Sequence, residues 1–463
     1  MKFTKFGKVL LMGALSAGVV FGVTSCVQSY TVGFLYVTGT VTAATGDIGI
    51  ISGYKIDHNT GKLAPINGLP VASGGANPVR AVLVTGSRFL YVLNRGANAE
   101  GNGDCTLADP CLKPNITQFA VGGNGILTVQ NTFFTQGVNP FRMIGDSTGN
   151  YLLVLDHDSP DNSNPSSSDG CARALSGALT CGDITIFQIN QTTGRLTLVL
   201  NAQVTAVSGA PLTYFPVPAN PVDFLLTSQY VLTLSGTAAQ TSFPYTGGSS
   251  VWPYQYNSTN GQLTVSSNSS QPLGIAQGNA IVIGNSVIYV LDNEPITIGS
   301  GSTFPPAAYS SQILPFTLGS GGALQADTGG IIPDAQILAN PIALLVDSKN
   351  KYVYVANQGN NVTGGTYPGS GIAGYVIENS NAFQLEFVGN ASNPDGYFGS
   401  GSGPQCIVED PSDQFIYEAN EYDSTISGRV LDPISGLLDD MRVTESYPLQ
   451  GPPTWCLMDG RTG

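Results

Sequence analysis

The chain is short of charged side chains, histidine and tryptophan. Asp, Glu, Lys and Arg make up only 10% of its 463 residues, and it contains 2 His and 2 Trp. A helical protein is not expected, because the exposed faces of helices usually carry Lys, Glu and Arg. The 31 acidic residues outnumber the 17 basic ones, giving a net charge of −14. Nucleic-acid binding needs a basic surface, so we expect no nucleic-acid partner.

Several motifs of catalysis and metal binding are also missing. The sequence has no phosphate-binding GxxxxGK[ST] loop and no CxxC pair. With so few histidines, a structural zinc site is not expected. Asp156, Asp158 and Asp161 could supply oxygen ligands to a calcium ion, although their spacing lacks the EF-hand pattern. We predict no cofactor and no metal, and leave the calcium question open.

The first 25 residues read as a signal peptide. Lys2, Lys5 and Lys8 precede an apolar run, 9–23, that is too short and too rich in glycine for a membrane-spanning helix. The run ends in Val-Thr-Ser-Cys26, which resembles the bacterial lipobox, whose cysteine receives the lipid. We therefore expect lipidation at Cys26, a tether over 26–33 and an exported lipoprotein of the cell envelope. An ordinary secretory signal is the alternative.

The remaining cysteines indicate disulfides. Six of the 7 cysteines are left once Cys26 is assigned to lipidation, and an even number is expected in an oxidising compartment. Cys105 and Cys111 lie in one loop rich in glycine and aspartate, and Cys171 and Cys181 bracket another. The last two, Cys406 and Cys456, are left for each other, with two buried free thiols as the alternative.

An internal repeat decides the fold class. Units of about sixty residues start at 77, 139, 220, 278, 340 and 403, most often with Asn-Pro. Each unit contains four strand-like runs, A to D, separated by turn residues. Strand A follows Asn-Pro, B is the FLYV or YVYV run, and a glycine turn joins C to D because a tight hairpin needs a positive φ. The units therefore predict four-stranded antiparallel blades.

The two termini supply one more blade. The N-terminal segment offers strands B, C and D, and the C-terminal segment 454–459 offers the missing strand A. We predict an all-β, seven-bladed β-propeller over 34–463, closed by both ends of the chain so that no sheet edge stays open. In this alignment Cys406 and Cys456 lie on the innermost strands of adjacent blades, so their disulfide would lock the ring.

The lengths of the loops indicate which face of the ring is functional. Turns between A and B and between C and D are short, whereas the long insertions fall between B and C or between D and A. In a four-stranded meander these long loops emerge on one face. Binding and catalysis concentrate on loops held by a rigid scaffold, so we expect the site on that face.

The repeat resembles the seven-bladed lactonase-type propellers, the family typified by bacterial 6-phosphogluconolactonase and related to a fungal carboxymuconate-lactonising enzyme. The resemblance rests on the run Tyr-Val-Tyr-Val-Ala-Asn at 352–357, the Thr-Gly hairpins and the Asn-Pro starts. Its most specific stretch is 417–426, which is similar to the N-E-x-D-S-T-V segment of that family. The resemblance implies lactone hydrolysis, with Arg and His near the starts of A strands at the mouth of the central channel.

Four residues are the resulting catalytic candidates. Arg80 in NPVR and Arg142 in NPFR occupy equivalent places and could hold an anion, or could simply pair with carboxylates; Asp223 takes that place in NPVD. His157 is suited to proton transfer near neutral pH, with a loop histidine of no function as the alternative. Glu421 could orient substrate or act as a base, unless its segment only caps a turn.

Two functions remain open from the sequence. The first is a lactonase-like hydrolase acting on a sugar or acid lactone at the long-loop face. The second is a non-catalytic surface propeller that binds protein or glycan, since a shared fold does not settle function. Whether the protein is an enzyme stays undecided at this point. We expect a monomer that meets the membrane only through its lipid anchor.

Overall fold

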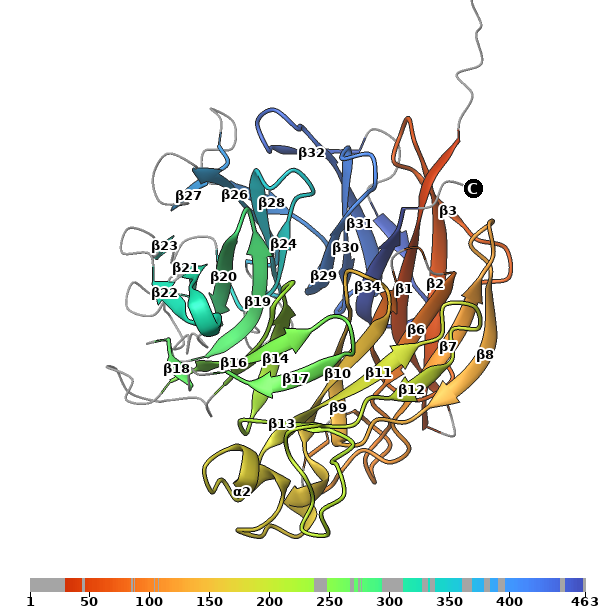
Figure 1. The fold of residues 1–463 in the computed structure, drawn as a ribbon. Coiled ribbons are helices and arrows are strands. Elements are labelled where there is room, and N and C mark those ends of the chain that lie inside the picture. The colour runs from red at the N-terminus through yellow and green to blue at the C-terminus, as the bar shows by residue number, and fades with distance from the viewer. Residues whose placement is uncertain are drawn as a thin grey trace, which may run out of the picture.

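Seven small antiparallel sheets stand in a ring around a central axis (Figure 1). This is the predicted seven-bladed β-propeller. The structure is a computed structural model that describes residues 30–43, 46–84, 86, 88–103, 105–106, 108–236, 248–266, 270–273, 275, 277–293, 311–326, 332–333, 338–359, 369–378, 384–389, 396–441 and 446–460. The predicted signal peptide and Cys26 lie outside these residues.

Each blade is a meander whose first strand faces the axis. The first three blades are β5 (Pro78–Leu83), β6 (Phe89–Asn94), β7 (Asn115–Val121) and β8 (Leu127–Phe133); β9 (Val138–Gly145), β10 (Tyr151–Asp158), β11 (Gly182–Ile189) and β12 (Leu196–Leu198); and β14 (Pro221–Leu226), β15 (Tyr230–Ser235), β16 (Ser250–Asn257) and β17 (Gln262–Val265).

The next three blades follow the same order. They are β19 (Gly278–Gly284), β20 (Val287–Asp292), β21 (Gln312–Leu318) and β22 (Leu324–Ala326); β24 (Pro341–Val346), β25 (Tyr352–Asn357), β26 (Gly371–Glu378) and β27 (Gln384–Phe387); and β29 (Pro404–Glu409), β30 (Phe415–Asn420), β31 (Thr425–Leu431) and β32 (Leu438–Asp440).

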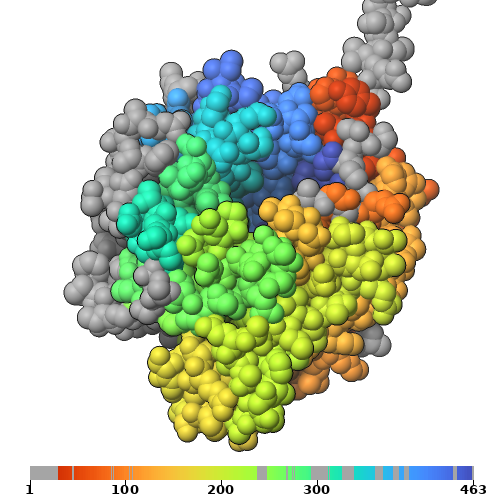
Figure 2. Space-filling view, viewed as in Figure 1, coloured from red at the N-terminus to blue at the C-terminus, as the bar shows by residue number. Residues whose placement is uncertain are grey.

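The seventh blade joins the two ends of the chain. It combines β1 (Thr31–Ala43), β2 (Gly46–Asp57) and β3 (Leu63–Pro65) with the C-terminal strand β34 (Pro453–Asp459). Strand β34 pairs with β1 in a register that sets Val37 opposite Cys456, and the red N-terminal segment accordingly lies beside the blue C-terminal one in Figure 2. The predicted closure by both termini is confirmed. Strand β1 begins at Thr31, inside the segment expected to be a tether.

Six of the seven sheets carry a short fifth strand that the sequence pattern did not reveal. In each case it lies within the D–A connection, and it pairs with residues in the first half of strand C, whereas strand D pairs with later residues of the same strand. These strands are β4 (Val71–Ala72), β13 (Phe215–Val217), β18 (Gln271–Pro272), β23 (Ile332–Pro333), β28 (Tyr397–Gly399) and β33 (Ser446–Pro448). Strand D is in effect interrupted, and the predicted four strands per blade are otherwise confirmed.

Every inner strand contains a bulge close to its first residue. In the first blade Pro78 is paired with Asn94 and Arg80 with Leu93, so Val79 is the extra residue. The same shift occurs in the other six inner strands. A bulge bends the strand and redirects the side chains that follow it. The asparagine before proline supports this geometry, since Asn77, for example, has a φ of 49°, a conformation that asparagine tolerates better than most residues.

The hydrophobic core is divided among the seven interfaces between blades. Each of seven apolar clusters takes its residues from two neighbouring sheets. Tyrosines of the B strands reinforce several of these interfaces by donating a hydrogen bond to a carbonyl in the C–D turn of the next blade. Tyr417 bonds the Gly61 carbonyl at 2.6 Å and Tyr354 bonds the Gly436 carbonyl at 2.8 Å. A blade is therefore not an independent unit, and the ring is expected to unfold cooperatively.

All three predicted disulfides are present. They join Cys105 to Cys111, Cys171 to Cys181, and Cys406 to Cys456. The last links the inner strands β29 and β34, whose half-cystines have Cα atoms 5.8 Å apart. It therefore connects the sixth blade to the seventh where the ring closes.

Helical structure is confined to short segments between strands. Among the described residues these are η1 (Pro160–Ser163), α2 (Gly170–Ala174) and η2 (Ser320–Gly322). No helix in this part of the chain is long and apolar enough to cross a membrane.

Candidate binding site in the central channel

The inner strands enclose a cavity of about 780 Å³ on the axis of the ring. All seven inner strands contribute to its wall. Ligand sites are commonly concave and fall between about 300 and 1,000 Å³, so the cavity is large enough for a small molecule.

The residues that follow the bulges lie at one level of the ring, and all of them except the buried half-cystine Cys406 line the cavity. In chain order these seven positions hold Arg80, Arg142, Asp223, Ala280, Ala343, Cys406 and Trp455. The three charged side chains thus occupy consecutive blades, the first to the third. Among the described residues lining the cavity they are the only charged ones.

The two arginines converge on Asp223. Its Oδ1 lies 3.3 Å from Nε of Arg142 and 3.9 Å from an Nη of Arg80. The other carboxylate oxygen accepts a hydrogen bond from the Ile281 amide at 3.0 Å, which fixes the carboxylate against the fourth blade. The predicted alternative, pairing of the arginines with a carboxylate, therefore holds in part, because one carboxylate serves two cations.

Arg80 also lies over the indole of Trp455, with its Cζ 3.5 Å from the ring centroid. A guanidinium on an aromatic face gains from the negative face of the ring. Burial lowers the pKa of Arg80 well below its ordinary value, the nearby Arg142 lowers it further, and Asp223 opposes both. Arginine stays protonated in proteins. The lowered pKa of Arg80 therefore expresses the free-energy cost of burying its charge next to a second cation, Arg142. This level of the cavity therefore carries one positive charge in excess, in a protein with a net charge of −14.

A second level of the cavity is entirely aliphatic. Two residues beyond the first level, each inner strand presents a half-buried aliphatic side chain. We call this set the aliphatic collar: Val82, Ile144, Leu225, Val282, Leu345, Val408 and Leu457. Six of the seven line the cavity, Val408 being the exception. Each one also packs against a different interblade cluster.

Glu421 reaches this cavity through one intermediate side chain. Its Oε2 accepts hydrogen bonds from the amides of Gln358, at 2.8 Å, and of Gln405. Gln405 is the bulged residue of β29 and lines the cavity, whereas Glu421 does not. The backbone of Glu421 is held by a 2.7 Å hydrogen bond to the Gly403 carbonyl. In the order of the ring, the sixth blade that carries Glu421 stands across the channel from Arg142 on the second.

The rest of the 417–426 segment has structural contacts. Asp423 accepts hydrogen bonds from the Thr425 hydroxyl, at 2.7 Å, and from the Ser402 amide, also at 2.7 Å. Asn420 donates to the hydroxyl of Ser427 at 2.9 Å. These bonds tie the B–C turn of the sixth blade to the connection that precedes it, so Glu421 is the member of the segment that is directed toward the cavity wall.

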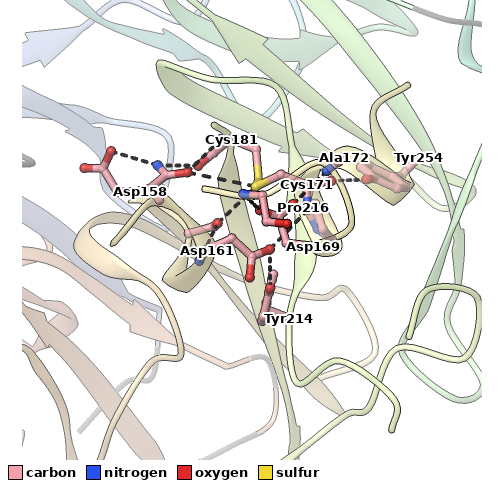
Figure 3. The surroundings of a disulfide bond; sticks show 12 residues. Asp158, Asp161, Asp169, Cys171, Ala172, Cys181, Tyr214, Pro216 and Tyr254 are labelled. Carbon is pink, nitrogen blue, oxygen red and sulfur yellow. Dashed lines mark hydrogen bonds between the residues drawn. A yellow bond between two sulfur atoms is a disulfide. The ribbon is translucent and has the colours of Figure 1, made fainter. Parts of the chain in front are cut away.

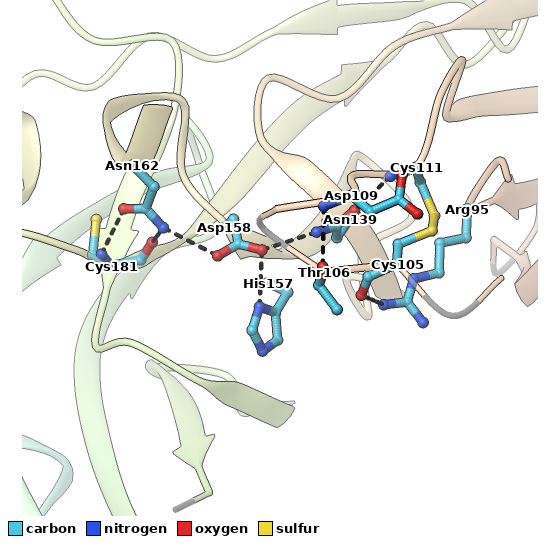
Figure 4. A network of polar contacts seen from close by, with 10 residues as sticks. All are labelled: Arg95, Cys105, Thr106, Asp109, Cys111, Asn139, His157, Asp158, Asn162 and Cys181. Atoms are coloured by element: carbon cyan, nitrogen blue, oxygen red, sulfur yellow. Dashed lines mark hydrogen bonds and ion pairs between the residues drawn. A yellow bond between two sulfur atoms is a disulfide. The ribbon is translucent and has the colours of Figure 1, made fainter. Parts of the chain in front are cut away.

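His157 lies outside the cavity lining, in a network that joins two disulfide loops (Figure 4). Its Nδ1 is 3.0 Å from Oδ2 of Asp158, which also accepts a hydrogen bond from Asn139 at 3.0 Å. Asn139 in turn accepts from the Cys111 amide, and Asn162 connects Asp158 to the backbone of Cys181. Burial opposes ionisation of Asp158, but these hydrogen bonds outweigh it and lower its pKa. The network places the loops 96–115 and 157–183 on one face, as the loop lengths predict for these two.

Of the remaining long insertions, 204–219 is described in full, and those at 236–250, 294–311, 358–371 and 389–403 are described only in part. The expectation that all of them share one face therefore stays a prediction.

The aspartates considered for calcium have separate partners, and Figure 3 shows those of Asp158 and Asp161. Asp156 is fully buried opposite Asp183, and Asp161 accepts from the Tyr214 hydroxyl at 2.6 Å. Burial raises the pKa of both Asp156 and Asp183, and their mutual repulsion adds to this at Asp183. Among the described residues, the one group within ligand distance of each other is Asp161, Asp169 and Cys171, whose sulfur is in a disulfide. This group carries no argument for a metal.

Some features of the cavity were missed from the sequence. Gln405, Trp455 and the aliphatic collar were not singled out, because their inward direction depends on the bulge. A signal was nevertheless present, since the residue two positions after each Arg80 equivalent is aliphatic in all seven blades.

Comparisons with known proteins support the fold. The sequence matches no family model and none of the curated proteins searched. Among solved structures, a candidate 6-phosphogluconolactonase from Bacteroides uniformis and a periplasmic gluconolactonase from Pseudomonas aeruginosa each superpose with a TM-score of 0.60 at 15% identity, covering 92% of this chain and 99% of theirs. A hypothetical selenium-binding protein from Sulfolobus tokodaii has a TM-score of 0.54 at 9% identity and covers 94% of this chain and 95% of its own. At these identities the likeness establishes the shared propeller fold, the fold of the lactonase-type propellers that the sequence resembles.

Proposed function

We propose that this protein is a lactonase-like propeller that binds a lactone, or the anionic acid derived from it, at the mouth of the central channel. The observation that carries the proposal is the excess positive charge of Arg80 and Arg142 over Asp223 inside a cavity of molecular size. Low-dielectric walls strengthen the field of a buried charge and concentrate a ligand of opposite sign. The gluconolactonase that shares the fold makes a lactone the first substrate class to test.

The proposed chemistry is the addition of water to the lactone carbonyl. The water oxygen bonds to the carbonyl carbon, the ring C–O bond breaks, and the ring oxygen leaves as a hydroxyl. Arg142 and Arg80 would stabilise the negative charge that develops on the carbonyl oxygen, which is the largest single contribution in many such sites. Glu421, which accepts a hydrogen bond from Gln405 of the opposite wall and lies behind it, would accept the proton from water once Gln405 moves aside, and would return it to the ring oxygen.

Of the two predicted proton-transfer residues, we favour Glu421 over His157. The His157 side chain is 41% exposed and is paired with Asp158. The ring of Phe141 contacts both His157, at 6.1 Å between ring centroids, and Arg142, whose Cζ is 5.4 Å from the Phe141 centroid. A role in holding the disulfide loops together accounts for its contacts.

The test is a hydrolysis screen on sugar lactones and alkyl lactones with the purified protein. Arg142→Met should lower kcat/KM by about 10²-fold or more, and Glu421→Gln by about 10²–10⁴-fold. Arg195→Met, which removes an exposed arginine on an outer turn bonded to Asn131, is the matched control and should leave turnover unchanged. Absence of turnover by the parent protein on every lactone would refute the proposal.

One observation favours a second function, ligand binding without catalysis. Both arginines already have a counter-ion, and the candidate base stands behind Gln405 instead of in the cavity wall. Anion binding that depends on Arg142, together with no hydrolysis of any lactone, would identify the protein as a binding propeller.

We also propose that the protein works outside the cytoplasm, attached to a membrane through a lipid on Cys26. Three disulfides support an oxidising compartment. Cys26→Ser should release the protein from the membrane fraction and abolish incorporation of labelled palmitate. If the variant stays in the membrane fraction and still incorporates labelled palmitate, lipidation at this residue would be contradicted.

A further inference from the structure

The cavity has two levels of opposite chemistry, and this restricts its ligand. The first level carries Arg80, Arg142 and Asp223, and the second is the aliphatic collar. Because they are two residues apart on the same strands, the levels are separated by about 6.6 Å along the strand direction. Six of the seven inner strands contribute an aliphatic collar residue to the cavity wall, so apolar side chains lie on most sides of the axis.

We propose that the ligand is amphipathic: an acid or lactone whose polar head lies against the arginine pair and whose unbranched alkyl chain extends along the axis into the collar. This deepens the proposed function, on which it rests for the position of the head group. It assigns the substrate class as alkyl-substituted lactones and their hydroxy acids, and it excludes sugar lactones as the preferred ligands.

The chemistry of the collar argues against a sugar. A sugar ring carries hydroxyls on most of its carbons, and the side chains of the collar offer them no hydrogen-bond partner in place of water, which leaves only backbone groups on the free edges of the inner strands. An alkyl chain has no such groups to satisfy. Each methylene moved from water into apolar surroundings raises affinity about fourfold. The collar therefore binds a longer alkyl chain more tightly.

The charged level selects an anionic or strongly polarised head. The single excess positive charge matches one carboxylate, whereas a phosphate with two charges would leave a negative charge near Asp223. Trp455, which covers Arg80 at 3.5 Å, closes one side of the head-group site with an apolar surface. Head and chain are therefore both accommodated by side chains of the inner strands.

The experiment measures binding of stable acids by calorimetry at neutral pH, so that it does not depend on turnover. The protein is the full chain carrying Cys26→Ser, and the probes are decanoate, hexanoate and gluconate. Decanoate should bind at least about tenfold more tightly than hexanoate. This ratio is smaller than complete burial of the additional methylenes would give, because part of the chain stays hydrated. Gluconate should bind more weakly than decanoate.

A matched pair of variants in one blade tests the collar. Val82→Asp introduces a charge into the collar on β5 and should remove the preference for decanoate over hexanoate. Val129→Asp makes the same change on the outer strand β8, where the side chain is 57% exposed, and should keep the preference. Val82→Thr preserves the shape of the side chain and should keep the melting temperature near that of the parent. It should still reduce the preference for decanoate, and this result could not be explained by misfolding of Val82→Asp.

Three results would overturn the inference: equal affinity for hexanoate and decanoate, tighter binding of gluconate than of decanoate, or a decanoate preference that survives both Val82 variants. These are distinct from failure of the proposed function. Decanoate binding without hydrolysis of δ-decalactone would remove catalysis and keep the ligand class, whereas hydrolysis of gluconolactone but not of δ-decalactone would do the reverse.

Discussion

Replacing Glu418 by glutamine is expected to stabilise the protein at neutral and alkaline pH but not in acid. Glu418 lies in β30 and is 1% exposed. Burial raises its pKa from 4.5 to about 8, and the attraction of Arg429 offsets only part of this. Because the folded state holds the proton more tightly than the unfolded state, folding stability is complete below pH 4.5 and is lost as pH rises toward 8.

The magnitude follows from the two pKa values. At pH 7 the unfolded carboxyl is ionised and the folded one is still protonated, which costs about 3 kcal/mol relative to acid; above pH 8 the cost approaches about 5 kcal/mol. Glutamine cannot ionise, so Glu418→Gln should gain these amounts over the parent and should equal it below pH 4.5. Either figure is a large share of the 5–15 kcal/mol by which a typical protein is stable.

The assay is urea unfolding of parent and variant below pH 4.5, at pH 7 and above pH 8. The parent also loses stability with pH through Asp156 and Asp183, whose pKa values burial raises, so the difference between the two proteins is the quantity to follow. Glu386→Gln, at an exposed position on β27, is the control and should change stability by less than about 0.5 kcal/mol at every pH. A Glu418→Gln protein that is less stable than the parent above pH 8 would mean that Glu418 is ionised and bound to Arg429, and the reasoning would be refuted.

Further predictions concern the ring and its cavity. Replacing Cys406 and Cys456 together by alanine should lower the free energy of unfolding by about 4 kcal/mol, from the entropy of a 50-residue loop, as measured by urea unfolding under oxidising conditions. Tyr417→Phe should cost about 1 kcal/mol in the same assay, because the Gly61 carbonyl loses its partner. Asp223→Asn should tighten binding of a carboxylate but lower the melting temperature, since the two arginines lose their counter-ion; weaker carboxylate binding would show that Asp223 contacts the ligand. His157→Ala should speed proteolysis of the 157–183 loop and leave lactone turnover intact, and loss of turnover would instead place it in the chemistry.

The ring could be predicted from the sequence because its signals are local and repeated. Asn-Pro marks the start of most inner strands, and glycine turns mark the C–D hairpins. The half-blades at 34–66 and 454–459 complement each other only if the ends meet. Once the ring is assumed, Cys406 and Cys456 fall on neighbouring inner strands, so their pairing follows from topology. None of these inferences needs the direction of an individual side chain.

The cavity could be predicted only in part because its lining depends on a backbone irregularity. One extra residue at the bulge reverses which side chains of the inner strand face the axis. Arg80 and Arg142 were found because charge on an inner strand is conspicuous, whereas Val82 and Ile144 look like any core residues. His157 is a residue that the sequence suggests for the site and that the structure places outside the cavity lining. Its partner Asp158 is held by Asn139 and Asn162, which come from separate segments of the chain.

The uneven distribution of charge around a sevenfold scaffold favours the channel as a binding site. The seven first-level positions are geometrically alike, yet the charged ones fall on three consecutive blades, and the fourth to sixth blades place Ala280, Ala343 and Cys406 there. Stability does not require this asymmetry, because alanine at the same position leaves the other blades well packed. The field across the channel therefore points from the second blade toward the sixth, where Gln405 and Glu421 stand. A ligand drawn to Arg142 would present its far side to that pair, which is the geometry that hydrolysis would use and that a symmetric, purely structural channel would not need.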